Sequence, residues 1–167
     1  AIALIIVLIL YARHYRANIL DLFDRFAFSA AIGAAMVRLG NFFNSEIVGR
    51  PTDLPWGVRF VRYDGGMVAR HPSQIYEFLM GLAILAILVI VDRKMGREHR
   101  PVGLLSGLFL ALYFLARFLV EFVKEFQALS DSALTMGQYL SILPFLAGVA
   151  LVVYAVKRNV RAEDVTP

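Results

Sequence analysis

The sequence predicts an all-α membrane protein, a polytopic transmembrane helix bundle. Of its 167 residues, 59% are hydrophobic and only 18% are charged, whereas soluble domains carry about 25% charged residues. The apolar residues gather in long runs, and most of the basic residues lie between these runs. This distribution is typical of helices that cross a bilayer and not of a soluble globular domain.

Five apolar runs predict the helices. The first run has 11 residues, which cover about 16 Å of a hydrocarbon core about 30 Å thick. The other four have 17 to 23 residues and are long enough to span. Because the chain opens with Ala1 inside an apolar run, we expect a fragment with four complete spans and one truncated N-terminal span. The runs are Ile2–Ala12, Phe26–Phe43, Ile75–Val91, Gly103–Val123 and Leu134–Val156.

Local signals mark the joints between these spans. Pro72 suits the first turn of a helix, where its missing N–H is not needed. The segment Thr135-Met136-Gly137-Gln138 has the spacing of a capping box, which predicts a helix start. Pro144 lies inside the last run and is expected to kink that helix. Gly103 and Gly107 form a GxxxG pair, which indicates close packing between helices.

The positions of Lys and Arg predict the orientation. Cytoplasmic loops carry an excess of these residues, so the segments that hold most of them are expected to be cytoplasmic, including a tail at about 157–167. A single membrane domain with an outer loop at about 44–73 follows. The four arginines of that loop (Arg50, Arg59, Arg62 and Arg70) are expected to meet anionic lipid headgroups. The basic cytoplasmic set is Arg13, Arg16, Arg93, Lys94, Arg97, Arg100, Lys157, Arg158 and Arg161.

The composition disfavours nucleic-acid binding and chemistry that depends on cysteine. The net charge of +4 is explained by topology, so no nucleic-acid partner is expected. The chain has no cysteine, which excludes disulfides, zinc–thiolate sites and a cysteine nucleophile within these residues. Matched halves typical of repeat-built transporters are not visible.

A polar stripe crosses the fourth run. Tyr113, Arg117 and Glu121 are spaced by four residues, and Lys124 follows three residues later. Charged residues within a span face the interior of a bundle and are functional by default. One interpretation is an Arg117–Glu121 ion pair that only locks helix packing. The other is a cationic site for an anionic headgroup, in which Glu121 orients Arg117.

A second polar group begins inside another run and continues into the outer loop. Arg38 and Asn41 lie within the span, and Asn44, Glu46 and Gly49 follow. The planar guanidinium of arginine matches phosphate oxygens, and amide side chains can donate to glycerol or ester oxygens. The alternative is a polar helix end solvated at the interface. That alternative explains Asn44 and Glu46 easily and Arg38 poorly.

The third group is Arg70-His71-Pro72-Ser73-Gln74-Ile75-Tyr76-Glu77, which enters a helix from the outer loop. His71 is either a helix cap or headgroup contact, or a base. No metal site is expected here, because no second histidine or carboxylate stands at ligand spacing.

These groups together resemble the prolipoprotein diacylglyceryl transferase family. The segment from Arg38 to Arg50, continuing through Gly57, is similar to the signature of that family, and Arg70–Glu77 is similar to a second motif. Tyr113-x3-Arg117-x3-Glu121-Phe122 and Met136-Gly137-Gln138 also fit. The resemblance runs from about Ala1 to the last helix. Lys124 stands where many members have Arg.

The resemblance implies a reaction at the bacterial cytoplasmic (inner) membrane. The family moves the diacylglyceryl group of phosphatidylglycerol to the thiol of the lipobox cysteine of a preprolipoprotein, and forms a thioether and glycerol 1-phosphate. The expected partners are therefore phosphatidylglycerol, the preprolipoprotein signal peptide and membrane lipid, with no cofactor and no metal. The site would face the periplasmic, outer-leaflet side.

The resemblance also assigns residues. Arg38 would hold the lipid phosphate and Arg117 would stabilise charge on the departing glycerol phosphate. Other family site positions would shape the pocket, and they are matched by Asn41, Glu46, Gly49, Tyr113 and Glu121. The family has further N-terminal helices and a His-Gly-Gly segment with a proposed base upstream of the matched region, so these residues alone are expected to be inactive. As catalytic residues we predict Arg117, Glu121, Tyr113, Asn41 and Glu46, and as phosphatidylglycerol-binding residues Arg38, Gly49, Asn44 and His71.

Two rival functions stay open on sequence grounds. A transporter or channel could use Arg117 and Glu121 as a gating or substrate pair, and would respond to a gradient without needing a thiol peptide. A non-catalytic membrane subunit could use the outer loop to bind lipid, and would tolerate Arg38→Ala if folding survived.

Overall fold

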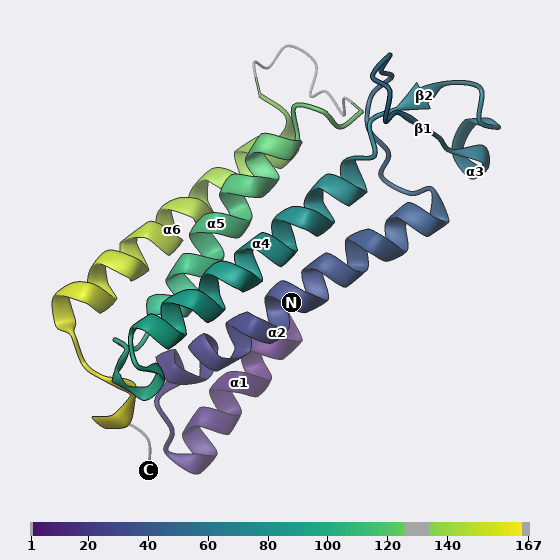
Figure 1. Cartoon of the computed structure of the whole chain (residues 1–167). Coiled ribbons are helices and arrows are strands. Elements are labelled where there is room, and N and C mark those ends of the chain that lie inside the picture. Colours follow the sequence, from purple (N-terminus) through teal and green to yellow (C-terminus); the bar gives the residue numbers. More distant parts are fainter. Residues whose placement is uncertain (1, 126–133, 165–167) are drawn as a thin grey trace.

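The computed structural model describes residues 2–125 and 134–164, and most of them are helical. Three long apolar helices and two shorter ones run along the molecule (Figure 1). The long helices α2, α4 and α6 have the length and composition to cross a membrane. Residues 126–133, which lie between the last two predicted runs, and the end of the expected tail are outside the described residues. The helices are α1 (Ile2–Tyr15), α2 (Ile19–Asn44), α4 (Ser73–Lys94), α5 (Leu104–Val120) and α6 (Met136–Arg158).

Each predicted apolar run overlaps one helix, and the differences lie at the ends. The capping box is confirmed, because the Thr135 side chain accepts from the Gln138 N–H and the Gln138 side chain accepts from the Thr135 N–H. Pro144 lies inside α6 as predicted. Pro72 is the N-cap of α4 instead of a residue of its first turn. Helix α5 ends at Val120, three residues before the predicted end at Val123.

The helices approach closely where small residues face each other. A Cβ added at Gly81 of α4 would lie 2.9 Å from the Cβ of Ala35 in α2. A Cβ at Gly107 of α5 would lie 3.0 Å from the carbonyl oxygen of Gly148 in α6. The GxxxG pair therefore contributes close packing through Gly107, as predicted, because small residues let helix backbones approach in an apolar solvent. A core that includes Ala27, Leu88 and Leu105 lies between α2, α4 and α5.

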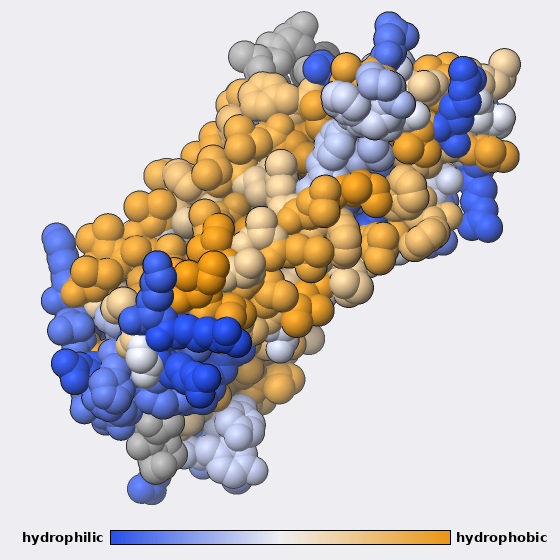
Figure 2. Space-filling view, viewed as in Figure 1, coloured by the Kyte–Doolittle hydropathy of each residue, from blue (hydrophilic) through white to orange (hydrophobic). Residues whose placement is uncertain are grey.

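The surface between the two ends of the bundle is apolar. Figure 2 shows a hydrophobic band along the helices with hydrophilic residues gathered at both ends. Large apolar side chains such as Leu143, Val37 and Leu79 are exposed on this band. Exposed apolar surface of this extent is expected where helices contact lipid chains.

The basic end of the bundle is organised around a buried ion cluster. Arg100 was expected only to mark the cytoplasmic side of the membrane. Its side chain is instead 3% exposed and pairs with Asp21 at 3.1 Å and Asp92 at 3.2 Å. Asp24 is fully buried and accepts from the N–H groups of Gly103 and Ser106, each at 2.8 Å. Asp24 therefore caps α5 from α2, since the first N–H groups of a helix have no partner within it.

The other end carries the connection between α2 and α4, which was predicted as a loop at about 44–73. It contains a short antiparallel pair of strands that no pattern in the sequence indicated. Val58 pairs with Arg70, and Arg59 pairs with Ala69. The elements are β1 (Val58–Arg59), α3 (Val61–Asp64) and β2 (Ala69–Arg70) (Figure 1).

Two of the loop arginines have partners within the protein. Arg70 is buried and pairs with Asp64 at 2.9 Å and Glu125 at 3.0 Å, and Arg59 donates to the carbonyl oxygens of Gly66 and Met67. The buried Arg70 thus holds the connection together instead of meeting headgroups, whereas Arg59 is exposed and its expected role at headgroups stays a prediction.

Candidate active site

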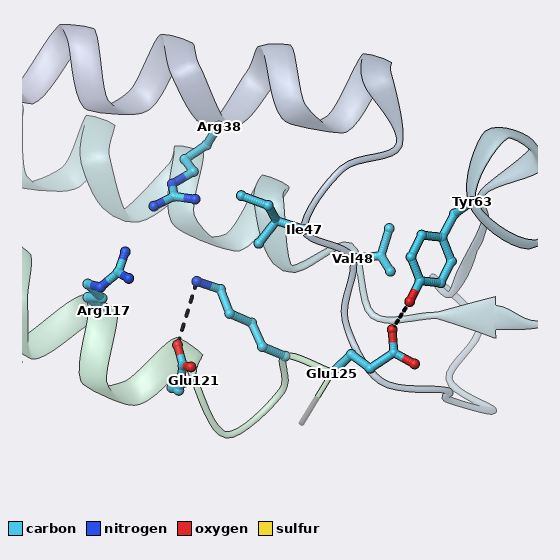
Figure 3. A pocket seen from close by; sticks show the side chains of 8 residues that line it. Arg38, Ile47, Val48, Tyr63, Arg117, Glu121 and Glu125 are labelled. Atoms are coloured by element: carbon cyan, nitrogen blue, oxygen red, sulfur yellow. Dashed lines mark hydrogen bonds and ion pairs between the residues drawn. The ribbon is translucent and has the colours of Figure 1, made fainter. Parts of the chain in front are cut away.

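A pocket of about 570 Å³ lies where the C-terminal ends of α2 and α5 meet the connection between α2 and α4. Polar and charged side chains dominate its wall. In Figure 3, Arg38 of α2 and Arg117 of α5 point into the same space from different helices. The structure thus brings together the two arginines that the sequence predicted as the main site residues. The lining residues are Arg38, Ile47, Val48, Tyr63, Arg117, Glu121, Lys124 and Glu125.

Four charged side chains form a continuous network at this pocket. Glu77, near the start of α4, pairs with Arg38 at 3.3 Å and with Lys124 at 3.0 Å. Lys124 also reaches Glu121 at 3.7 Å. These side chains are at most 13% exposed, so their charges interact more strongly than they would on an open surface. The network joins α2, α4 and the end of α5.

Arg117 stands outside this network. Among the described residues its side chain has no ion-pair or hydrogen-bond partner, although Glu121 lies only four positions away. The predicted Arg117–Glu121 pair is therefore wrong. Helix α5 ends at Val120 and Glu121 is its C-cap residue, so Glu121 reaches Lys124 instead. Arg117 is left with its guanidinium directed at the pocket (Figure 3).

The carboxylate of Glu121 lies against the first turn of α6. A Cβ added at Gly137 would lie 2.6 Å from Glu121 Oε2, so only glycine leaves room for this carboxylate. The first N–H groups of a helix and its dipole favour a negative charge at this place. The Met136-Gly137-Gln138 motif thus provides the space and the favourable electrostatic position that the Glu121 carboxylate occupies.

Gly49 has an equally specific reason to be glycine. A Cβ there would lie 2.6 Å from the Cβ of His71 and 2.8 Å from the carbonyl oxygen of Val123. The N–H of Gly49 donates to His71 O at 3.0 Å, and the N–H of Arg50 donates to Val123 O at 3.0 Å. Gly49 was predicted as a lipid-binding residue, and its contacts show that it joins three backbone segments beside the pocket.

His71 lies next to the pocket and not among its lining residues. Its Nδ1 is 3.3 Å from the hydroxyl of Tyr76, which also accepts from Trp56 Nε1 at 2.8 Å. Burial and the positive charge of Arg50 lower the pKa of His71 from its ordinary value of 6.5. The imidazole is therefore neutral at pH 7.

The rim of the pocket is held by a second polar group. Tyr63 donates a hydrogen bond to Glu125, as Figure 3 shows, and the guanidinium of Arg70 lies 4.8 Å from the Tyr63 ring centre. The bond to the Glu125 carboxylate raises the pKa of the Tyr63 phenol. Because Glu125 directly follows Lys124, this rim and the charged network share one short segment.

The other predicted residues occupy more peripheral positions. Tyr113 lines a small neighbouring cavity together with Arg38, Glu77 and Arg117. Asn41 is half-buried near the end of α2, while Asn44 and Glu46 are exposed. Among the described residues, none of these three lines the main pocket.

Sequence reasoning missed Glu77 as a site residue. It was seen as part of a motif and as a charge near the start of an apolar run. A carboxylate within the first turns of an otherwise apolar helix was itself the signal, because such a charge needs a partner inside the bundle. Lys124 was noticed in the polar stripe without being assigned to the site, and Tyr63 and Glu125 carried no signal in the sequence.

Comparison with known proteins gives a consistent result. The family model described as "Prolipoprotein diacylglyceryl transferase" matches residues 1–154. Relatives named phosphatidylglycerol–prolipoprotein diacylglyceryl transferase are 42% identical in Porphyromonas gingivalis, over 95% of this chain and 61% of the relative, and 41% identical in Geobacter sulfurreducens, over 89% and 56%. The relative from Cupriavidus pinatubonensis is 42% identical over 95% of this chain and 57% of its own length. The chain thus spans about three fifths of the length of these curated relatives.

Proposed function

Because the chain belongs to the prolipoprotein diacylglyceryl transferase family, we propose that its protein transfers a diacylglyceryl group from phosphatidylglycerol to a cysteine thiol of a preprolipoprotein. The sulfur attacks the glyceryl carbon that bears the phosphate. A carbon–sulfur bond forms, the carbon–oxygen bond breaks, and its electron pair leaves with glycerol 1-phosphate. The thiol proton passes to a base.

The observation that carries this proposal is the unpaired Arg117 beside Arg38 in a partly buried pocket. A phosphodiester has one negative charge, and its leaving group gains a second as the bond breaks. Donors that are already aimed at developing charge stabilise a transition state most effectively. Arg117 has its donors free, whereas Arg38 is held by Glu77 at 3.3 Å. Arg38 therefore suits binding of the phosphate, and Arg117 suits stabilisation of the charge that develops on it.

The other predicted residues take supporting roles in this proposal. Glu121 and Tyr113 set the wall around Arg117, and Gly49 brings the connection close to Lys124. Asn41, Asn44 and Glu46 lie toward the outer end of α2, where they can meet the lipid glycerol or the incoming peptide. His71 is neutral and close by, which suits a weak base or a headgroup contact.

A protein of this family with such apolar helices is a multi-pass protein of a bacterial membrane. We further propose that all five helices cross, with α1 as part of a span, that the basic end is cytoplasmic and that the pocket opens on the periplasmic side. The gathering of Arg93, Lys94 and Lys157 at one end supports this orientation. The partners would be phosphatidylglycerol, the lipobox-bearing signal peptide and membrane lipid.

Single cysteines introduced into these residues, which contain none, test the orientation, with any cysteine elsewhere in the complete protein replaced by serine. Met67→Cys in the outer connection, where the side chain is 79% exposed, and Lys157→Cys near the end of α6 each introduce one thiol. In cells with an intact cytoplasmic membrane, an impermeant maleimide should label the first variant, and the second only after permeabilisation. The reverse pattern would overturn the orientation.

The reaction is tested by a transfer assay on the protein expressed from its complete reading frame. The protein is mixed with phosphatidylglycerol and a lipobox-cysteine peptide, and the peptide mass is measured. Arg117→Gln should lower the rate by roughly 100-fold or more, because a single donor to a developing oxyanion contributes that much. Arg117→Lys should retain part of the rate, since it keeps the charge and loses the planar fork.

Arg158→Gln provides a matched control, because Arg158 is an exposed arginine at the end of α6 whose side chain, within the described part of the chain, bonds to Tyr154. It should leave transfer unchanged. If the well-folded wild-type protein adds no diacylglyceryl mass while a known transferase does so in parallel, the proposed reaction is wrong. Gradient-driven uptake without a thiol peptide would then favour a transporter.

A further inference from the structure

Glu77 occupies a central position in the pocket network. Its two carboxylate oxygens face different cations: Oε2 lies 3.3 Å from Arg38 Nε and Oε1 lies 3.0 Å from Lys124 Nζ. The side chain is only 8% exposed. One carboxylate from α4 thus holds a cation of α2 and a cation that follows α5.

The charges of the pocket leave a defined surplus. Arg38, Arg117 and Lys124 are the cations, and Glu77 and Glu121 are the carboxylates in contact with them. Glu125 at the rim is paired with Arg70 and accepts from Tyr63, and Arg70 also holds Asp64, which lies outside the pocket lining. With these five groups in their charged forms, one positive charge is in excess within this set of described residues, and it resides on the Arg117 side chain, which has no ion-pair partner among them.

This surplus discriminates between a phosphodiester and a phosphomonoester. Attraction to the site grows linearly with the charge of the ligand, whereas the desolvation penalty grows with the square of that charge. A phosphodiester has one negative charge, and a phosphomonoester has about 1.5 to 2 at neutral pH. A single surplus positive charge therefore compensates the desolvation penalty of the diester. For the monoester, the same charge compensates only part of the larger desolvation penalty.

From this balance we infer that Glu77 is a positioning residue that fits the pocket to a phosphodiester lipid and promotes release of the phosphomonoester product. It does so by neutralising Arg38 and Lys124 in part while it leaves Arg117 free. The inference rests on the proposed transferase reaction, because that reaction converts a diester into a monoester in this pocket. It adds a reason why a buried carboxylate stands between two cations of the pocket network.

The inference predicts a specific shift on Glu77→Gln. The substitution keeps the shape of the side chain and raises the surplus charge by one. A ligand with two charges gains about twice as much attraction as a ligand with one, so the logarithm of its affinity rises about twice as far. Competitive inhibition by added glycerol 1-phosphate should strengthen by at least 10-fold, while KM for phosphatidylglycerol should fall by about the square root of that factor. The kcat should fall because product leaves slowly.

Three companion variants separate charge from shape. Glu77→Asp keeps the charge but shortens the reach to both cations, so kcat should fall while product inhibition stays close to wild type. Lys124→Gln lowers the surplus charge and should weaken product inhibition.

The double variant Glu77→Gln/Lys124→Gln restores the surplus, and should restore inhibition by glycerol 1-phosphate to near the wild-type value even if Glu77→Gln alone folds poorly. Glu98→Gln makes the same charge change in the η1 turn (Arg97–His99), where it contacts Arg25, and should change nothing.

The test is steady-state transfer by the complete protein in mixed micelles of phosphatidylglycerol and detergent, with glycerol 1-phosphate as inhibitor. Stronger inhibition in Glu77→Gln and its reversal in the double variant are the expected results. Inhibition that is unchanged in both the Glu77→Gln and Lys124→Gln variants, with an active wild type, would overturn the inference and leave the proposed reaction standing. An inactive, well-folded wild type would instead remove the reaction on which the inference rests.

Discussion

Gly137→Ala tests directly whether glycine is needed to hold the Glu121 carboxylate against the first turn of α6. The new methyl carbon would lie 2.6 Å from Glu121 Oε2, about 1 Å closer than two such atoms can approach. The backbone at Gly137 has little freedom to retreat, because its carbonyl accepts from Ser141 Oγ at 2.6 Å and the capping box joins Thr135 and Gln138 on either side of it. The Glu121 side chain must therefore swing away from α6.

The expected magnitude follows from what this movement removes. The carboxylate loses its place at the first turn of α6, which contributes about 0.3 to 1 kcal/mol, and the 3.7 Å pair with Lys124. Overpacking in tight sites costs about 1 to 3 kcal/mol. The lower half of that range applies, because the group that yields is the end of a rotatable side chain. We expect a loss of about 1 to 2 kcal/mol in the free energy of unfolding and a clear loss of transfer activity.

The assay combines thermal unfolding in detergent with the transfer measurement. Gly33→Ala is the matched control, because a Cβ at Gly33 of α2 would have no neighbour within 4 Å. Alanine there should be neutral or stabilise the helix by up to about 1 kcal/mol. Wild-type stability and activity in Gly137→Ala would refute the idea that glycine is required to seat the carboxylate.

Further predictions concern packing, capping and pH. Gly148→Ala should destabilise more than Gly137→Ala, toward 3 kcal/mol, because its methyl would lie 2.5 Å from the backbone nitrogen of Ala111, which cannot rotate away; equal melting temperatures would contradict this. Asp24→Ala should cost roughly 2 to 4 kcal/mol in unfolding experiments by leaving the buried N–H groups of Gly103 and Ser106 without an acceptor, and Asp24→Asn should lie between it and wild type. The His71 imidazole should titrate below 6.5 by NMR. Since the folded pKa is lowered, its contribution to stability is complete above about pH 6.5 and declines as the pH falls below that value, and His71→Asn should remove this slope.

The helices were predictable because the bilayer imposes a length and a composition on each span. The capping box of α6 was also predictable, since all its contacts lie within four residues. The end of α5 was not. Phe122 and Val123 continue the apolar pattern, but the backbone leaves the helix after Val120 to pair with the segment around Gly49. Such a distant partner leaves no local trace in the sequence.

The site was predictable in its cations and less so in its carboxylates. Arg38 and Arg117 stand out because charged residues within apolar runs must face the interior of the bundle. The pairing of Glu121 was predicted from helical spacing, which places residues four apart on one face. That rule failed because Glu121 is the C-cap and Lys124 lies beyond the helix. The role of Glu77 depends on the distance between α4 and two other segments, and so needed the structure.

The backbone pairing of Gly49 with Lys124 has a consequence for biogenesis. As a nascent chain leaves the ribosome, α2 and α4 can insert and meet before α5 has been synthesised. The contact between Gly49 and Lys124 then closes a segment of about 75 residues, at an entropic cost of about 4 kcal/mol. The pocket is therefore one of the last parts of these residues to assemble, and a chain arrested before α5 would hold Arg38 and Glu77 without Lys124 or Arg117.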